Sequence, residues 1–155
     1  MVPVAIIKSL GNLISGKLTF PKFNLNKTIR MDDGLQFKIF RHMKLAFKNN
    51  STETAVFIVR FKFKRFSHPT NIRLSCIPMF MIAGFPGFHD KIWMIDWETG
   101  YWQGVYQWES MQAIEKYKQS FVLGMMNKRA IASSVSYHIL LNTDLKNFIQ
   151  MHENT

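Results

Sequence analysis

The sequence lacks several features that would assign it to a common functional class. Cys76 is the only cysteine in 155 residues, which excludes an intrachain disulfide and a cysteine cluster for zinc or an iron–sulfur centre. The complete dinucleotide and phosphate-binding glycine motifs and the Gly-x-Ser-x-Gly motif of serine hydrolases are missing, and the five histidines show no His-x-x-x-His spacing. We therefore expect no metal, no bound cofactor and a reducing, cytoplasmic location.

Acidic residues are also scarce, with 10 Asp and Glu against 20 Lys and Arg and a formal net charge of +10. The part up to Thr54 is the more basic, with 9 basic and 3 acidic residues. Such a surface suits an anionic partner, but no block of five or six like charges occurs, as many nucleic-acid-binding tails have. The strand predicted from Ala55 also lacks the signature of an RNA-recognition module, so we do not expect a nucleic-acid partner.

Long apolar runs are absent as well. The opening segment MVPVAIIKSLGNLISG is interrupted by Lys8, and its apolar runs fall short of the ~20 residues that span a bilayer. Val4, Ile7, Leu10 and Ile14 recur at helical spacing, which predicts a short amphipathic helix. We expect this helix to dock on protein, and contact with a membrane surface is the less favoured alternative.

The chain has a clear order of elements from Ala55 onward. The segment AVFIVRFKFK alternates, with Phe57, Val59, Phe61 and Phe63 on one face of a predicted strand. A first predicted helix follows, capped by Ser67 or Thr70 and kinked at Pro78. Two strands come next, then a second helix capped by Ser110, and then a last strand. This order predicts a ferredoxin-like βαββαβ antiparallel sheet, with two helices on one face, in the α+β class.

The strongest local signal is the aromatic hairpin from His89 to Trp108. Its predicted loop is Trp97–Gly100, with Gly100 free to take a positive φ. This loop pairs Ile95 with Trp102, Trp93 with Gly104, Lys91 with Tyr106 and His89 with Trp108. On that pairing one face collects His89, Lys91, Trp93, Ile95, Trp102, Tyr106 and Trp108, and Gly104 leaves room for the Trp93 indole. The rings form either a packed core or one wall of a pocket, and the pattern alone leaves both open.

At this hairpin the sequence resembles a family. The resemblance rests on five short motifs, which are Pro86-Gly87, Lys91-Ile92-Trp93, Asp96 with Thr99-Gly100, Gly104-Val105-Tyr106 and Trp108-Glu109. They resemble small monooxygenases of the dimeric α+β barrel superfamily, relatives of the antibiotic biosynthesis monooxygenases. The resemblance covers Ala55 to about Asn142 and departs from the family at His89-Asp90 and Pro78.

The resemblance implies a homodimer with a ligand pocket between sheet and helices in each protomer. It also implies a cofactor-independent monooxygenase that acts on an aromatic or polyketide-like small molecule, although a non-catalytic small-molecule-binding protein fits the same pocket. Trp93, Tyr106, Trp108 and Arg60 are the candidate substrate-binding residues. His89, Lys91 and Arg73 are the candidate catalytic residues, because they can stabilise a substrate anion.

Three regions follow from these patterns. Residues 55–142 form the ferredoxin-like domain, residues 1–54 an extension that packs on the domain or its partner, and residues 143–155 a tail that is a loop or a short helix. Within the extension, LQFKIFRHMKLAF is either a strand or a helix, because its periodicity fits both. With helices on only one side of the sheet, we expect the other face to form the homodimer interface.

Overall fold

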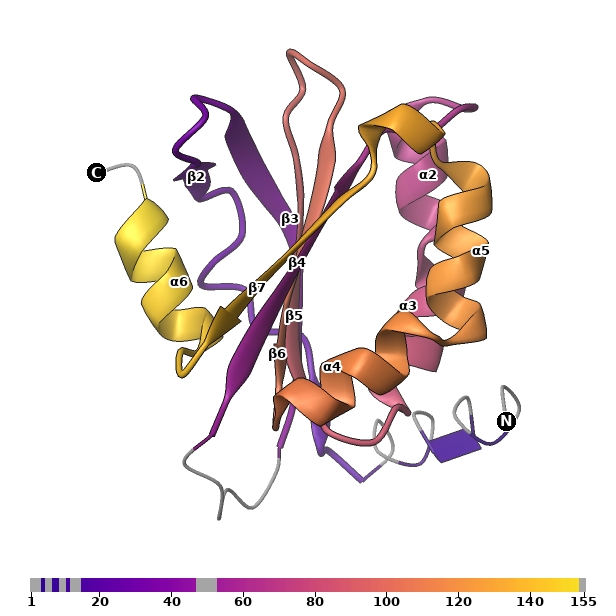
Figure 1. The fold of residues 1–155 in the computed structure, drawn as a ribbon, viewed down its shortest axis with the longest axis vertical. Helices are drawn as coiled ribbons and strands as arrows, with labels where there is room; N and C mark the ends of the chain where they lie inside the picture. The colour runs from indigo at the N-terminus through magenta and orange to yellow at the C-terminus, as the bar shows by residue number, and fades with distance from the viewer. Residues whose placement is uncertain (1–3, 5–6, 9–10, 12–14, 47–52, 154–155) are drawn as a thin grey trace.

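The computed structural model of the protein describes residues 4, 7–8, 11, 15–46 and 53–153. These residues form a seven-stranded antiparallel sheet with helices on both sides (Figure 1). The strands are β1 (Leu18–Thr19), β2 (Thr28–Arg30), β3 (Gln36–Leu45), β4 (Ala55–Phe61), β5 (Phe88–Ile95), β6 (Trp102–Trp108) and β7 (Ser136–Leu141). The helices are α2 (His68–Leu74), α3 (Cys76–Ala83), α4 (Met111–Lys118), α5 (Phe121–Arg129) and α6 (Leu145–His152), with a short 3₁₀ turn at Ala132–Ser134.

The predicted ferredoxin-like unit is confirmed. Strands β5, β6, β4 and β7 lie side by side in that order, with α2 and α3 between β4 and β5 and with α4 and α5 between β6 and β7. The undecided segment 35–47 contains a strand, β3, which pairs with β5 and so extends the sheet beyond the unit. Strands β1 and β2 both pair with β3. The strands that the structure describes before Ala55 therefore belong to the same sheet.

Each predicted helix is divided into two short ones. Ser67, not Thr70, caps α2, and its hydroxyl accepts a hydrogen bond from the Thr70 amide. The division at Ser75 has a cause in Pro78, which has no amide hydrogen and whose ring crowds the carbonyl four residues earlier, that of Leu74. Backbone bonding resumes where Met79 donates to the Ser75 carbonyl at 3.0 Å.

The second predicted helix divides at Ser120. Ser110 caps α4, as expected, and the Ser120 hydroxyl accepts a hydrogen bond from the Leu123 amide to cap α5. The change of direction separates residues that a single straight helix would place on one face. Phe121 is therefore 62% exposed, whereas Tyr117 and Leu123 are buried.

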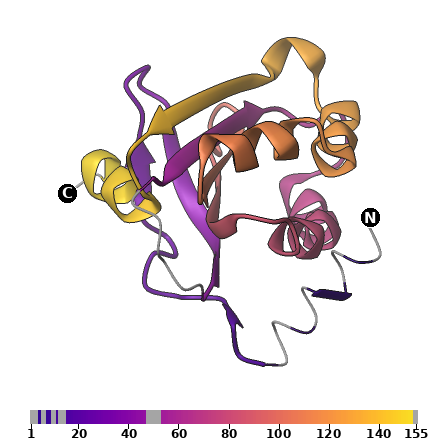
Figure 2. The same ribbon diagram turned by 60° about the horizontal axis from the view of Figure 1, so that its bottom comes forward.

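The two faces of the sheet carry two separate cores. Helices α2 to α5 cover one face, called the helix-covered face, and α6 lies on the other side, called the opposite face (Figure 2). The helix-covered face is rich in aromatic residues and includes Phe57, Tyr106 and Trp108. The opposite face is mainly aliphatic, and its core residues are Ile29, Phe37, Ile39, Val56, Ile58, Ile92, Met94, Val105, Leu145, Phe148 and Ile149.

The premise of the dimer prediction is wrong, because the opposite face is not left bare. Val56, Ile92 and Val105 on this face are fully buried within the chain. Helix α6, from the segment expected to be a tail, packs Phe148 and Ile149 into the same core. Homodimerisation stays a prediction, but the uncovered apolar sheet face on which it was based is not present.

The predicted amphipathic helix falls mostly outside the described residues. Of the four apolar residues that predict it, Leu10 and Ile14 lie outside them, whereas Val4 and Ile7 are described and exposed. Among the helices that the described residues form, none has the length and apolar character needed to cross a membrane.

Candidate functional site

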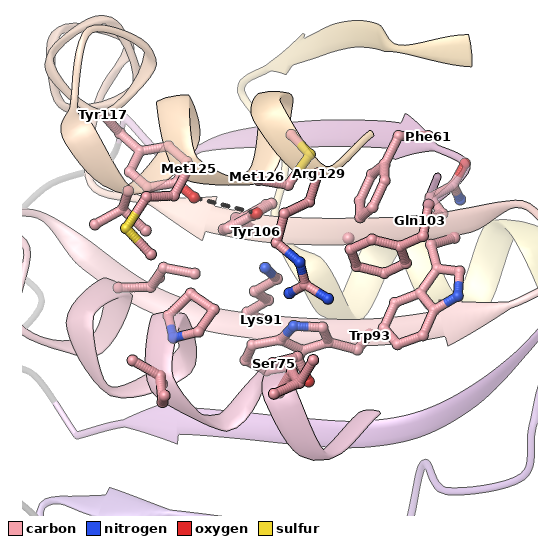
Figure 3. A pocket seen from close by; sticks show the side chains of 18 residues that line it. Phe61, Ser75, Lys91, Trp93, Gln103, Tyr106, Tyr117, Met125, Met126 and Arg129 are labelled. Carbon is pink, nitrogen blue, oxygen red and sulfur yellow. Dashed lines mark hydrogen bonds between the residues drawn. The ribbon is translucent and has the colours of Figure 1, made fainter. Parts of the chain in front are cut away.

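A cavity of about 270 Å³ lies between the helix-covered face and helices α3, α4 and α5 (Figure 3). Strands β5 and β6 supply its floor with Lys91, Trp93, Gly104 and Tyr106. The remaining lining comes mainly from rings, methionines and aliphatic side chains, and it includes the polar residues Ser75, between α2 and α3, and Arg129 on α5. The aromatic lining residues are Phe61, Phe63, Trp93, Trp102, Tyr106 and Tyr117.

The hairpin forms with the predicted register over most of its length. Asp96 and Tyr101 close the loop, Gly100 has φ +84°, and the Asp96 carboxylate accepts hydrogen bonds from the amides of Glu98 and Thr99. Trp93 pairs with Gly104 and Lys91 with Tyr106, as expected. This register brings Lys91, Trp93 and Tyr106 together on the helix-covered face, where all three line the cavity.

The predicted pairing of His89 with Trp108 is wrong, because a β-bulge lies between Phe88 and Asp90. Phe88, not His89, lies opposite Trp108, and the extra residue turns His89 away from the aromatic face. The His89 ring meets the Gln107 amide on the opposite face, with 3.4 Å between Nδ1 and Nε2. Burial lowers the pKa of His89 to about 4, so the ring is neutral at physiological pH. His89 therefore does not lie at the cavity.

The side chain of Lys91 lies against two aromatic rings. Its Nζ is 3.8 Å from the centre of the Tyr106 ring and 4.3 Å from that of Trp93. Burial, together with the charge of Arg41, holds the pKa of Lys91 well below its ordinary value. Among the described residues, no hydrogen bond or ion pair of this amine is found.

Gly104 makes the space for this lysine, and not for the Trp93 indole as the sequence suggested. A Cβ placed on Gly104 would lie 3.0 Å from Cε and 3.3 Å from Nζ of Lys91, and 3.1 Å from Cε1 of Tyr106. These distances are shorter than ordinary carbon contacts. Any side chain at this position would therefore push into the floor of the cavity.

Two tyrosines form one end of the cavity. The hydroxyl oxygens of Tyr106 and Tyr117 are 3.3 Å apart, and Figure 3 shows the pair bridging β6 and α4. Burial raises the pKa of both phenols, so both keep their protons and can donate hydrogen bonds. Trp108 packs against both rings, 6.2 Å from Tyr106 and 4.9 Å from Tyr117. It supports them from behind and does not line the cavity, in contrast to its predicted role.

Two arginines that the sequence did not single out lie at the site. Arg129 lines the cavity from α5, where its guanidinium donates to Oδ1 of Asn71 at 2.5 Å and lies over the Phe63 ring. Arg41 lies over Trp93, on the side of the ring toward β3, and donates to the Ser75 hydroxyl and the Ile72 carbonyl. A bulge in β3 between Ile39 and Arg41 places Arg41 on the helix-covered face.

The other two predicted arginines do not reach the cavity. The Arg60 side chain lies on the opposite face, where it donates to Gln103, pairs with Asp33 and covers the Phe37 ring. Arg73 is exposed on the outside of α2 and does not line the cavity. Neither residue is therefore placed to contact a ligand held there.

The opposite face contains a buried polar cluster of its own. Nε2 of His42 lies 2.6 Å from Oδ1 of Asp90, and the amide of Asn24 lies 3.5 Å from the other ring nitrogen. Gln107 accepts a hydrogen bond from the Leu145 amide and so fixes the start of α6. The cavity on the helix-covered face is not lined by this cluster, and the described residues contain no group of three or more metal-type ligands.

One glycine motif near the start of the chain is incomplete. Gly11 to Lys17 have the Gly-x-x-x-x-Gly-Lys spacing of a phosphate-binding loop, but Leu18 stands where that loop requires Ser or Thr. Residue 18 also begins the short strand β1, whereas a phosphate-binding loop leads into a helix. This segment therefore lacks the context of a nucleotide site.

Comparison with known proteins identifies the fold. No family model matches the chain, and no curated protein matches it in sequence. Among solved structures it is similar to an uncharacterised ferredoxin-fold protein from Listeria monocytogenes related to antibiotic biosynthesis monooxygenases, with a TM-score of 0.54 at 9% identity over 88% of each chain. A monooxygenase-like protein from Listeria innocua has a TM-score of 0.53 at 10% identity, covering 84% of each chain.

A third similar structure is a heme-degrading enzyme from Listeria monocytogenes, with a TM-score of 0.52 at 12% identity, covering 84% of this chain and 90% of the other. These likenesses show that the chain has the ferredoxin-like α+β fold of proteins related to antibiotic biosynthesis monooxygenases. At such identities they establish the fold and not a specific activity.

Proposed function

We propose that this protein binds a small, flat, anionic aromatic molecule in the cavity beside Lys91, Trp93 and Tyr106. The observation that carries this proposal is the combination of aromatic walls with one guanidinium, that of Arg129, on the lining. No carboxylate occurs among the described residues that line the cavity, so an anionic ligand meets no like charge there.

The size and chemistry of the cavity limit the ligand. Its volume of about 270 Å³ lies near the lower end of the ~300–1,000 Å³ usual for ligand pockets. Trp93 and the two tyrosines offer faces and edges for one ring system. Met125 and Met126 on α5 add flexible side chains that adapt to different ring shapes.

Arg129 is the expected anion contact. Its guanidinium is held from one side by Asn71 and rests on Phe63, which leaves other donor hydrogens free of these two contacts. In Figure 3 the side chain points from α5 toward Lys91 and Trp93. One of the two tyrosine hydroxyls donates to the other, and the hydroxyl whose proton stays free is expected to donate to a second polar group of the ligand.

A titration of tryptophan fluorescence with 4-hydroxybenzoate tests the proposal. Removing the charge in Arg129→Gln should weaken binding about tenfold or more, which corresponds to the ~1.5–3 kcal/mol of a charged hydrogen bond. Lys128→Gln makes the same charge change one residue away on the exposed side of α5 and should leave the affinity unchanged.

Two results would contradict the proposal. One is equal weakening by both variants, which would mean that the ligand responds to overall charge and not to this cavity. The other is a crystal structure with 4-hydroxybenzoate bound elsewhere while the cavity stays filled by side chains.

A cofactor-independent monooxygenase is the second candidate. In such a reaction an activated CH₂ group of an aromatic or polyketide-like substrate becomes C=O, and the second oxygen atom leaves as water, so the substrate supplies all the electrons. The cavity supports this role because Arg129 and the tyrosine hydroxyls can stabilise the phenolate that reacts with oxygen. The fold likeness to monooxygenase-like proteins favours testing this reaction first.

Oxygen consumption measured with bound, electron-rich phenols and no added cofactor distinguishes the two candidates. Consumption that depends on Arg129 supports an oxygenase, and binding without consumption supports a binding protein. Hemin belongs among the tested compounds because one similar structure is a heme-degrading enzyme.

A further inference from the structure

Lys91 occupies a position that is unusual for a lysine. It lies in the middle of β5, between β3 and β6, and is only 5% exposed. The neighbouring carboxylate, Asp90, points to the opposite face and is engaged with His42. Among the described residues the amine has no hydrogen-bond or ion-pair partner, and it faces the cavity.

The balance of forces favours an uncharged amine at this position. Contact of an ammonium with the face of an aromatic ring is a weak attraction. Removing an ammonium from water costs more than such contacts return when no counter-charge is present. Arg41, on the far side of Trp93, adds repulsion. Desolvation therefore exceeds the ring contacts, and the neutral form has a lone pair available for bonding.

The other groups around the amine do not reverse this balance. The charged and titratable side chains that line the cavity with Lys91 are Tyr106 on β6, Tyr117 on α4 and Arg129 on α5, and Arg41 on β3 contacts its Trp93 wall. His68 on α2 accepts a hydrogen bond from the Trp102 wall, and burial lowers its pKa, which favours the neutral ring. Arg41 and Arg129 are cations, and the two phenols keep their protons. Every charge near Lys91 thus disfavours its ammonium form.

We propose that Lys91 is an imine-forming residue that condenses with the aldehyde or ketone group of an aromatic ligand whose acidic group is held by Arg129. This inference rests on the proposed function, because it assigns a reactive group to the ligand of the same cavity. A neutral amine, an anion contact and an aromatic wall are the three elements that such a ligand requires.

The reaction needs no co-reactant. The Nζ lone pair attacks the carbonyl carbon, and one amine proton moves to the former carbonyl oxygen, giving a carbinolamine. Loss of that oxygen as water, with the second amine proton, leaves the C=N bond. Tyr106 is placed beside Nζ, and its protonated hydroxyl can donate a hydrogen bond to the carbonyl oxygen as negative charge develops on it.

Gly104 is part of the same arrangement. A side chain at this position would approach Nζ and the Tyr106 ring to within 3.3 Å. The space next to the amine is where the carbonyl carbon must approach. Glycine therefore preserves the path of attack.

Reductive trapping tests this proposal in the intact protein. The probe is 4-carboxybenzaldehyde with sodium cyanoborohydride at about pH 7, where exposed lysines are protonated. We expect one adduct per chain by intact mass, mapped to Lys91 by peptide analysis. Its formation should be at least about tenfold faster than that at Lys62, because one unit of pKa changes the neutral fraction tenfold.

Lys62 provides the matched control. It also lies over an aromatic ring, 4.6 Å from the centre of Tyr101, but it is not part of the cavity. Lys62→Arg should keep the rapid adduct, and Lys91→Arg should lose it. The mapping on the unchanged protein decides the question even if Lys91→Arg folds poorly.

A carboxylic acid of similar shape that has no aldehyde or ketone group distinguishes this proposal from the proposed function. If 4-methylbenzoate binds and competes with 4-carboxybenzaldehyde, but no adduct forms at Lys91, the imine proposal is wrong and the binding site stands. If neither compound binds, both proposals are wrong. Adducts spread evenly over Lys62 and the exposed lysines would also overturn the imine proposal.

Discussion

The two faces of this sheet are built from the same strands but have different interiors. On the helix-covered face, large rings and a buried amine surround a cavity of about 270 Å³. On the opposite face, aliphatic side chains of β4, β5 and β6 pack against α6, and buried polar groups satisfy one another. Alternation along a strand decides which residues each face receives, but their shapes and partners decide whether the face is filled.

The two faces also differ in whether their buried polar side chains have partners within the protein. His42 and Asp90 meet directly on the opposite face, and Arg60 has both Gln103 and Asp33. On the helix-covered face Lys91 lies against two rings and has no hydrogen-bond or ion-pair partner among the described residues. Buried polar groups usually have partners, so a group without one suggests that the partner is a ligand.

The largest expected effect is a loss of stability on the opposite face. Phe148 is fully buried in α6, and Phe148→Ala should lower the free energy of unfolding by about 3–5 kcal/mol. The affinity of the folded protein for 4-hydroxybenzoate should not change. Urea denaturation and fluorescence titration measure the two quantities. Met151→Ala, at a position 78% exposed on the same helix, is the control and should change stability by less than ~0.5 kcal/mol. A large loss of affinity in folded Phe148→Ala would show that the faces are not independent.

A smaller loss of stability, with loss of binding, is expected at the cavity floor. Gly104→Ala places a methyl group against Lys91 and Tyr106, which should cost about 1–3 kcal/mol of stability and abolish ligand binding. Gly124→Ala in α5 meets no atom within 4 Å and should stabilise the protein by about 0.8–1 kcal/mol, because alanine favours helix. Thermal unfolding and the same fluorescence titration measure both variants. Unchanged binding in Gly104→Ala would contradict the assigned floor.

The smallest expected effect is a change in the pH dependence of stability. Because the pKa of Lys91 is lowered in the folded state, the unfolded state holds one more proton between that pKa and about 10.4. Stability therefore rises with pH through this window, by at most about 1.4 kcal/mol per pH unit from this group. Lys91→Met should remove that contribution, so the stability of wild type minus that of the variant should rise with pH. Parallel curves from urea denaturation at several pH values would contradict the neutral amine.

Local signals explain why much of the fold was predictable. The hairpin follows from Gly100 and alternation on both sides of it, and Ser67 and Ser110 begin helices through hydrogen bonds within three residues. Strand β3 was one of two alternatives that the sequence did not separate, because its residues fit two periods and only pairing with β5 selects one. Helix α6 was undecided for a similar reason, since the core that it covers is distant in sequence.

The candidate site was predictable only in part, because some of its residues are placed by local signals and others by tertiary contacts. Lys91, Trp93 and Tyr106 follow from the hairpin register, which a local turn determines. The bulge at Phe88–Asp90 carries no clear sequence signal, so His89 was assigned to the wrong face. Arg41 and Arg129 come to the site from β3 and α5 through tertiary packing, and a sequence pattern does not show such approaches.

The most direct test of the difference between the two faces is the ionisation state of Lys91. In protein labelled with ¹³C, the Cε shift of each lysine reports whether its amine is charged, and Lys91→Arg assigns its signal. We predict that Lys91 is neutral at pH 7 and shows no titration step near 10.4, while exposed lysines titrate there. A Lys91 signal that titrates together with those of the exposed lysines would show that the cavity holds an ammonium, and would contradict the neutral amine.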